Sequence, residues 1–207
     1  MIPTFYPLVD TGVCRARGVE PLDLARACLR GGARLLQLRC KDGPGAELLD
    51  LADRLVALAR PFDAAVIIND RADIARMAGA AGVHVGQDDL PATHVRAIVG
   101  PSAIVGLSTH DRRQVDVAAA LPVSYIAVGP VFGTTTKETG YAARGLDLVR
   151  YAAATGAPVV AIGGITLENA ALVAAAGAAA VAVIGDLFTG GDPEARTRAF
   201  LRLPWGT

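Results

Sequence analysis

The sequence lacks the features of nucleic-acid-binding and membrane-spanning proteins. Lys plus Arg and Asp plus Glu both total 20, so the formal net charge is +0 and no surplus of positive charge favours a polyanion. Aromatic residues make up only 5% of the chain. The longest uncharged runs, Tyr151–Leu167 and Ala170–Gly185, contain glycines and fall short of the roughly 20 apolar residues that a membrane helix needs. We therefore expect neither nucleic acid nor a membrane among the partners.

Cysteine is also scarce. Cys14, Cys28 and Cys40 are odd in number and have no CxxC spacing, which argues against a disulfide framework and against a zinc site. The opening residues, MIPTFYPLVD, have no basic segment ahead of an apolar one and do not resemble a secretory signal. We expect a cytoplasmic protein in which Cys28 is buried in a helix. The sequence indicates no particular oligomeric state.

What the sequence does contain is an alternation of short apolar runs with longer segments rich in Ala, Leu and Arg. Most runs are continuously apolar, as is typical of parallel strands that are covered on both faces. The predicted strands are Thr4–Val9, Leu35–Leu38, Ala65–Ile68, Gly82–Val85, Ile104–Leu107, Tyr125–Val128, Pro158–Ile162 and Ala180–Ile184. The predicted helices are Pro21–Arg30, Ala46–Arg60, Arg71–Ala78, Ala92–Val99, Arg112–Ala120, Gly145–Ala154, Leu167–Ala175 and Pro193–Leu201.

Several predicted helices have recognisable ends. Pro21 and Pro193 suit a first helical turn, Gly31 and Gly100 suit a C-terminal cap, and Thr166 suits an N-cap.

Eight βα units in a chain of 207 residues predict a single-domain α/β fold, a (β/α)8 TIM barrel over residues 1–207. The alternative is an open doubly wound sheet, which often has a glycine-rich loop after its first strand. The first predicted strand is followed by DTGVCRARG, which matches no GxGxxG pattern. In a barrel the functional groups follow the strands, so the candidate site residues are those just after each predicted strand.

The second predicted strand runs into QLRCKD. Gln37, Arg39 and Lys41 alternate, so all three side chains project to one side of an extended segment. One amide and two cations on one face suit a multiply charged anion. The alternative is a solvated basic turn, which would leave the inward position of Gln37 unexplained.

Carboxylate and amide side chains follow the third and fourth predicted strands. Asn69 and Asp70 end the third, and Asp88 and Asp89 follow the fourth after Gln87. Helix capping explains any one of them. Carboxylates at two adjacent strand ends instead predict a hard, oxygen-liganded cation such as Mg2+ rather than zinc.

The histidines and Ser108 have more ordinary explanations. His84, inside an apolar run, is expected to be a hydrogen-bonded core residue. Strand five ends GLSTH without the GxSxG pattern of a nucleophile elbow, so Ser108 is expected to donate a hydrogen bond to a substrate and His110 to begin a helix.

The last three units predict phosphate binding. GPVFGTTTKETG places Thr134, Thr135 and Thr136 before Lys137, and hydroxyls with a mobile cation bind phosphate oxygens. An exposed polar loop is the alternative. AIGGITLENA and AVAVIGDLF follow the strands whose loops often bind phosphate in barrels, so a second pocket, distinct from the Lys41 and Lys137 cluster, is expected there.

Six blocks resemble thiamine-phosphate synthase in order and spacing: QLRCKD, IINDRADIA, GVHVGQDDLP, VGLSTH, GPVFGTTTK and AIGGI. The resemblance runs from about Phe5 to Phe188. It implies a (β/α)8 barrel and a transferase, thiamine-phosphate diphosphorylase, that joins hydroxymethylpyrimidine pyrophosphate to thiazole phosphate with Mg2+. In that family pyrophosphate leaves first, the aminopyrimidine stabilises the methylene cation, and the thiazole nitrogen then attacks.

The resemblance also implies a set of site residues. The pyrimidine pyrophosphate is held by Gln37, Arg39, Lys41, Asn69 and Lys137. The metal is held by Asp70 and Asp89, but not by Asp88. The thiazole phosphate is held by Thr134, Thr136, Gly164 and the backbone at Ile184 and Gly185. Ser108 lies beside the pyrimidine and the leaving pyrophosphate, and is catalytic together with Lys137 and Arg39.

One position departs from the family pattern. The family commonly has serine where this chain has Gly185, followed here by Asp186. We expect Asp186 to point outward or to cap its helix, because an inward carboxylate would repel a phosphate. A thiazole tautomerase-like barrel and a non-catalytic phosphometabolite-binding barrel are the alternative functions.

Overall fold

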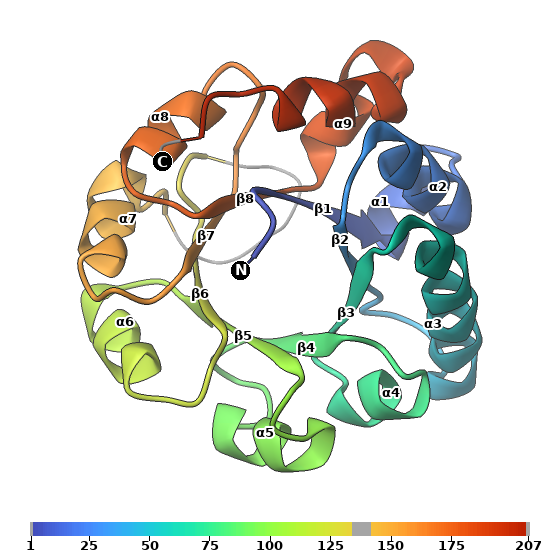
Figure 1. The fold of residues 1–207 in the computed structure, drawn as a ribbon, viewed down its shortest axis with the longest axis horizontal. Coiled ribbons are helices and arrows are strands. Elements are labelled where there is room, and N and C mark those ends of the chain that lie inside the picture. Colours follow the sequence, from blue (N-terminus) through green and yellow to red (C-terminus); the bar gives the residue numbers. More distant parts are fainter. Residues whose placement is uncertain (1, 134–141, 206–207) are drawn as a thin grey trace.

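The computed structural model describes residues 2–133 and 142–205. It contains eight strands, each paired in parallel with the next, and β8 pairs with β1 to close the barrel (Figure 1). The strands are β1 (Phe5–Asp10), β2 (Leu35–Arg39), β3 (Ala65–Asn69), β4 (Gly82–Val85), β5 (Ile104–Thr109), β6 (Tyr125–Val128), β7 (Val159–Ile162) and β8 (Ala180–Val183). The predicted (β/α)8 barrel is confirmed, and the open doubly wound sheet is excluded.

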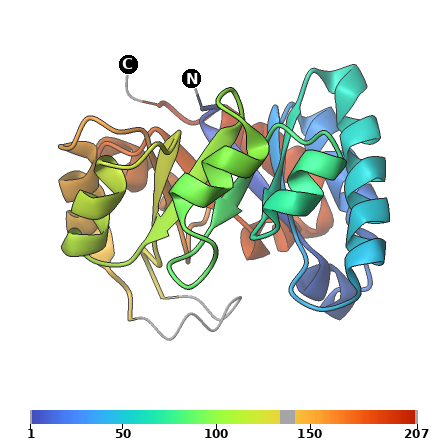
Figure 2. The same ribbon diagram turned by 90° about the horizontal axis from the view of Figure 1, so that it is seen from below.

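Helices lie outside the strands around the whole barrel (Figure 1), and the side view shows them in front of the strands and at both sides of them (Figure 2). They are α1 (Thr11–Ala16), α2 (Pro21–Gly31), α3 (Gly45–Ala59), α4 (Ala72–Met77), α5 (Ala92–Val99), α6 (Arg112–Ala119), α7 (Gly145–Ala153), α8 (Ala170–Ala175) and α9 (Pro193–Leu201). Two 3-10 segments, η1 (Arg60–Phe62) and η2 (Gly185–Gly191), complete the described structure. None of the helices in residues 2–133 and 142–205 is long and apolar enough to cross a membrane.

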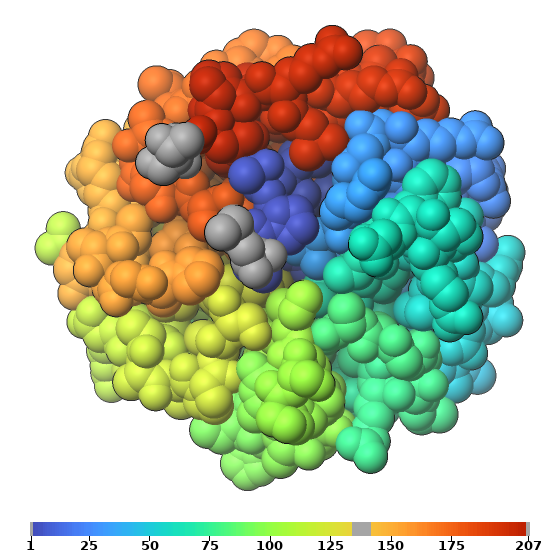
Figure 3. All heavy atoms as spheres, in the orientation of Figure 1, coloured from blue at the N-terminus to red at the C-terminus, as the bar shows by residue number. Residues whose placement is uncertain are grey.

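The strands are mostly apolar, as suits strands that are buried on both faces, and their polar residues lie mainly toward their C-terminal ends. In β2, Leu36 and Leu38 pack with the helices in the outer core, whereas Leu35 lies in the inner cluster of the barrel. This division follows from the two-residue period of a strand. Figure 3 shows one end of the barrel, where atoms of the N-terminal segment lie at the centre of the ring. The barrel interior is therefore a packed core, as is usual for this fold.

Several helix ends are as predicted. Pro21 and Pro193 occupy the first turns of α2 and α9, and Gly100 caps α5. The prediction for Gly31 was wrong by one residue: Gly31 is still helical, and Gly32, with φ of 106°, is the cap. Glycine is required at position 31 for a different reason: a Cβ there would lie only 2.6 Å from the Cβ of Thr197 in α9.

The start predicted for the helix Leu167–Ala175, which is α8 in the structure, was also wrong. The helix begins at Ala170 with Asn169 in the cap position, not after Thr166. The Asn169 side chain accepts a hydrogen bond from Thr166 N at 2.8 Å and donates one to Gly164 O at 2.9 Å. The intervening residues therefore form a turn that is tied to the loop after β7.

Candidate active site

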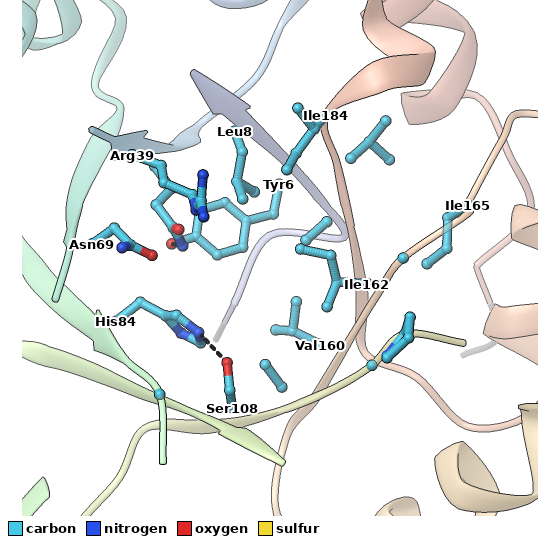
Figure 4. A pocket seen from close by; sticks show the side chains of 18 of the residues that line it. Tyr6, Leu8, Arg39, Asn69, His84, Ser108, Val160, Ile162, Ile165 and Ile184 are labelled. Atoms are coloured by element: carbon cyan, nitrogen blue, oxygen red, sulfur yellow. Dashed lines mark hydrogen bonds between the residues drawn. The ribbon is translucent and has the colours of Figure 1, made fainter. Parts of the chain in front are cut away.

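A cavity of about 560 Å³ opens where the strands end. Every strand of the barrel contributes lining residues, among them Tyr6, Gln37, Asn69, His84, Ser108, Tyr125, Ile162 and Ala182. Figure 4 shows that polar side chains of β2 to β5 lie on one side of the cavity and apolar ones, including Ile162, Ile165 and Ile184, on the other. The cavity thus has a polar half and an apolar half.

A chain of hydrogen bonds lies across the floor of the cavity. Gln37 Nε2 donates to the Tyr6 hydroxyl at 2.9 Å, and the hydroxyls of Tyr6 and Tyr125 are 3.3 Å apart. Tyr125 in turn bonds His84 Nδ1 at 2.9 Å, and His84 Nε2 bonds Ser108 Oγ at 2.8 Å (Figure 4). His84 is therefore the hydrogen-bonded barrel residue that the sequence predicted, and it also orients Ser108.

Tyr6 and Tyr125 remain protonated in this chain. Burial raises the pKa of both phenols above the ordinary value. Each hydroxyl consequently keeps a hydrogen to donate, and the two phenols are uncharged.

Arg39 ends β2, with its guanidinium toward the cavity (Figure 4). Gln37 is only 3% exposed inside the same strand, so the alternative of a solvated basic turn is wrong for this residue. Arg39 Nη1 donates to the carboxylate of Asp10, which ends β1. The sequence analysis did not identify Asp10 as part of the site.

Lys41, Asp70 and Asp89 come together at the polar rim. Lys41 Nζ forms an ion pair with Asp70, and Asp70 shares a hydrogen bond with Asp89. Burial raises the pKa of Asp70, the hydrogen bond from Lys41 offsets part of this rise, and the neighbouring Asp89 adds to it. Burial also tends to raise the pKa of Asp89, but hydrogen bonds with Asp70 and from Gly86 N, the latter at 2.7 Å, bring it below the ordinary value. The two carboxylates therefore titrate as a pair, in which Asp70 binds a proton more readily than Asp89.

Helix capping does not account for these carboxylates. The cap position of α4 is Arg71, and that of α5 is Pro91. Asp70 instead has φ of 63°, a left-handed conformation that turns the chain immediately after β3. The two predicted metal-binding aspartates are adjacent, as the sequence suggested.

The carboxylate pair fits Mg2+ by its chemistry. A cation between Asp70 and Asp89 would relieve the repulsion between their carboxylates, and oxygen ligands suit Mg2+. In the part of the chain that the structure describes, no group of three His, Cys, Asp or Glu side chains could hold a metal ion. Two carboxylates with water and substrate phosphate oxygens form the kind of site that Mg2+ commonly uses.

Asn69 points into the cavity from the end of β3 (Figure 4). It is 7% exposed, and among the described residues its Nδ2 atom has no hydrogen-bond partner. A buried amide without a partner is costly unless a ligand or water satisfies it. Asn69 is therefore available to donate to a bound oxygen.

The loops after β7 and β8 line the apolar half of the cavity. Gly163 and Gly164 have φ of 97° and 62°. A Cβ on Gly164 would lie 2.4 Å from the carbonyl oxygen of Gly133, so the loop after β7 packs directly against the loop after β6. Gly164, Ile184 and Gly185 line the same cavity as Lys41, so the prediction of a second, distinct pocket after β7 and β8 was wrong in that these loops and the polar rim share one cavity.

Asp186 does not cap its helix, whose N-cap is Ile184, but its side chain, only 7% exposed, is bound to Arg196 of the outer helix α9. It accepts hydrogen bonds from Arg196 Nε at 2.8 Å and Nη2 at 3.0 Å, and from Leu167 N at 3.2 Å. Arg196 in α9, which the sequence analysis missed, neutralises this carboxylate. The repulsion anticipated for a phosphate is reduced accordingly.

Other predicted residues differ in how far the structure describes them. Ser108 lies in the cavity, and His110 precedes α6, whose N-cap is Asp111. Thr134, Thr136 and Lys137 lie outside the described residues. Arg17, at the end of α1, also lines the cavity, although the sequence analysis had not assigned it a role there.

The site predicted from the sequence did not include Tyr6 and Tyr125, the most important residues that it missed. Each is polar and sits at an inward position of an apolar strand, FYPLV or SYIAV, and this was the signal that could have identified them.

Known proteins share the sequence and the fold of this chain. A family model described as "Thiamine monophosphate synthase" matches residues 5–187. The thiamine-phosphate synthase of Roseiflexus castenholzii is 46% identical over 187 residues, which is 89% of this chain and 82% of the relative. That of Koribacter versatilis is 42% identical and covers 98% of this chain and 96% of the relative.

The solved structures include a thiamine phosphate pyrophosphorylase from Pyrococcus furiosus, with a TM-score of 0.85 and 30% identity over 95% of this chain and 93% of that one. N-(5'-phosphoribosyl)anthranilate isomerase from Pyrococcus furiosus has a TM-score of 0.69 but only 12% identity, over 97% of this chain and 98% of that one. The latter similarity concerns the barrel alone.

Proposed function

The chain belongs to the thiamine monophosphate synthase family of transferases, and from this premise we propose that it joins hydroxymethylpyrimidine pyrophosphate to thiazole phosphate. The products are thiamine monophosphate and pyrophosphate. The proposal depends on how the cavity is divided. Its polar side brings together two cations and two carboxylates, those of Arg39, Lys41, Asp70 and Asp89. Its other side is apolar and lined by glycines.

The polar half suits the pyrimidine pyrophosphate. Arg39 and Lys41 offer charged donors to its phosphate oxygens, and the unpartnered amide of Asn69 offers a neutral one. The protonated hydroxyls of the floor, with Gln37, place hydrogen-bonding groups beneath the pyrimidine ring. Ser108, oriented by His84, lies between the ring and the leaving group. These residues bind and orient the substrate before any bond breaks.

The apolar half suits the thiazole phosphate. Ile162, Ile165 and Ile184 contact the ring, and the glycine loops around Gly164 and Gly185 approach its phosphate closely with the backbone. Thr134 and Thr136 are proposed to add hydroxyls, and Lys137 a cation, between the two substrates. Because both substrates lie in one cavity, the thiazole nitrogen faces the methylene carbon of the pyrimidine.

The reaction proposed is dissociative. The bond from the methylene carbon to the pyrophosphate oxygen breaks, and its electron pair leaves with pyrophosphate. The electron-rich aminopyrimidine stabilises the resulting cation, and the thiazole nitrogen forms the new bond to carbon. Mg2+ held by Asp70 and Asp89 would neutralise charge on the leaving group, while Arg39, Lys41 and Lys137 stabilise the same charge from the protein.

The test is release of pyrophosphate from the two substrates in the presence of Mg2+. We expect turnover by the wild-type protein and a loss of about 100-fold or more in Lys137→Ala and Asp89→Asn. Asp89→Asn keeps an oxygen for Gly86 N while removing the charge, and circular dichroism would verify that both variants fold. Tautomerisation of the thiazole phosphate without pyrophosphate release would refute the synthase function, and full turnover by both variants would refute the proposed site.

A further inference from the structure

Asp10 and Arg39 are the last residues of neighbouring strands and face each other in register. Tyr6 and Leu8, at alternate positions before Asp10, belong to the inner cluster of the barrel. The two-residue period of a strand places the Asp10 side chain on that same face. Asp10 therefore lies beside the polar half of the cavity, although it is not itself one of the lining residues.

Both carboxylate oxygens of Asp10 are engaged. Oδ1 accepts from Val13 N at 3.0 Å and so caps α1, and Oδ2 accepts from Arg39 Nη1. Asp10 is 5% exposed, so this ion pair is shielded from water. A pair shielded in this way keeps its geometry better than an exposed one, because little solvent competes for either charge.

Capping alone does not explain Asp10. Asp111 and Asp192 cap α6 and α9 with bonds of 2.8 Å and 3.0 Å, and both are exposed. Among these three aspartate caps, only Asp10 forms an ion pair within the described residues. Its partner, moreover, is a cation that lines the cavity.

Arg39 needs such a partner if it is to bind a substrate efficiently. A free arginine side chain samples many rotamers, and fixing one of them at the moment of binding costs entropy. With Nη1 held by Asp10, the plane of the guanidinium is set, and its other N–H groups remain for a ligand. Its Nε has no hydrogen-bond partner among the described residues.

We propose that Asp10 is a positioning residue, which holds the Arg39 guanidinium in the orientation that binds the pyrophosphate of the substrate. The proposal rests on the function proposed above. It assigns Asp10 no contact with the substrate.

The experiment compares Asp10→Asn with Asp111→Asn. Asparagine caps a helix about as well as aspartate, so both variants retain their caps, but only the first loses the charge that holds Arg39. We expect Asp10→Asn to raise the KM for the pyrimidine pyrophosphate about tenfold or more, with the KM for thiazole phosphate changed by less than about twofold. Asp111→Asn should leave both values unchanged.

The two KM values separate positioning from a folding defect. A partly unfolded enzyme loses active molecules, which lowers the apparent kcat and leaves both KM values in place. If Asp10 acts through Arg39, its effect should also shrink when Asp10→Asn is combined with Arg39→Lys. An unchanged KM for the pyrimidine pyrophosphate, equal changes in both KM values, or fully additive effects would overturn the proposal.

Failure of the synthase function is a separate result. If the wild-type protein released no pyrophosphate, calorimetric titration with pyrophosphate and Mg2+ would still test Asp10. Binding to Asp10→Asn should be weaker by about tenfold. Equal binding by the two proteins, or binding by neither, would overturn the role of Asp10.

Discussion

Gly106 leaves no room for a side chain in the middle of β5. A Cβ there would lie 2.1 Å from Tyr125 Cζ and 2.6 Å from His84 Nδ1. Both neighbours belong to the hydrogen-bonded floor, and Tyr125 is fully buried. The absence of a single methyl group therefore allows the tyrosine and the histidine to meet.

Gly106→Ala should destabilise the protein and impair the site together. Overpacking of this kind costs about 1 to 3 kcal/mol of unfolding free energy, measured by urea denaturation. The control is Gly45→Ala in α3, where the nearest contact of a Cβ is an ordinary 3.6 Å and alanine favours the helix. A Gly106→Ala protein with the stability and turnover of wild type would contradict the packing described here.

At the scale of single residues, the sequence predicted those site residues that are polar within an otherwise apolar strand. Gln37 and Ser108 were found because each is polar at the end of an apolar strand and lines the cavity. Tyr6 and Tyr125 were missed because tyrosine is also an ordinary core residue. Asp10 was missed because its role depends on Arg39, 29 positions away, and on pairing that only the barrel creates.

At the scale of elements, one half-buried arginine joins three segments. Arg196 of α9 binds Asp186 in η2 and Glu168 in the turn before α8. Asp186 also accepts a hydrogen bond from Leu167 N. The loops after β7 and β8, which line the proposed thiazole phosphate subsite, are thus fixed to the outer helix layer by one charge cluster.

Arg196→Met should lower the unfolding free energy by about 3 kcal/mol, because it leaves the buried charge of Asp186 unpaired. The double variant with Asp186→Asn should lose less than the sum of the two single losses, as urea denaturation would reveal. Arg198→Met, which breaks the more exposed pair with Glu194 on the same helix, is the control and should cost less than about 1 kcal/mol. Additive losses at Arg196 and Asp186 would argue against the cluster.

The sequence predicted the bounds of a strand or helix closely where the burial of apolar residues alone determines those bounds. Every predicted strand is present, with ends shifted by at most two residues, because the barrel buries both faces of each strand. The short α1 was not predicted, since TGVCRA has neither the length nor the pattern of an amphipathic helix; its N-terminus is capped by Asp10. α8 starts late because Asn169 ties the preceding turn to Gly164.

At the scale of the whole molecule, the cavity is assembled from residues of all eight strands. A ligand that fills it contacts both halves of the chain and binds only the folded state. Binding should therefore stabilise the complete barrel rather than one segment.

Pyrophosphate with Mg2+ should raise the melting temperature. At a ligand concentration of about 100 times Kd, the gain is about 2.7 kcal/mol, which for a domain of this size corresponds to roughly 5 to 10 °C in a calorimetric scan. Replacing Mg2+ by a chelator should remove most of the shift. An equal shift in the chelator would show that the carboxylate pair does not bind the metal together with the ligand.

The pairing of β1 with β8 has a consequence for synthesis on the ribosome. Phe5 pairs with Val181, so the strand made first meets its last neighbour only after about 175 further residues have been translated. At about 5 to 20 residues per second, β1 waits roughly 10 to 35 seconds with one hydrogen-bonding edge open. An open edge is a template for pairing with other chains. The nascent polypeptide is therefore most exposed to aggregation, and most in need of a chaperone, just before its eighth strand emerges.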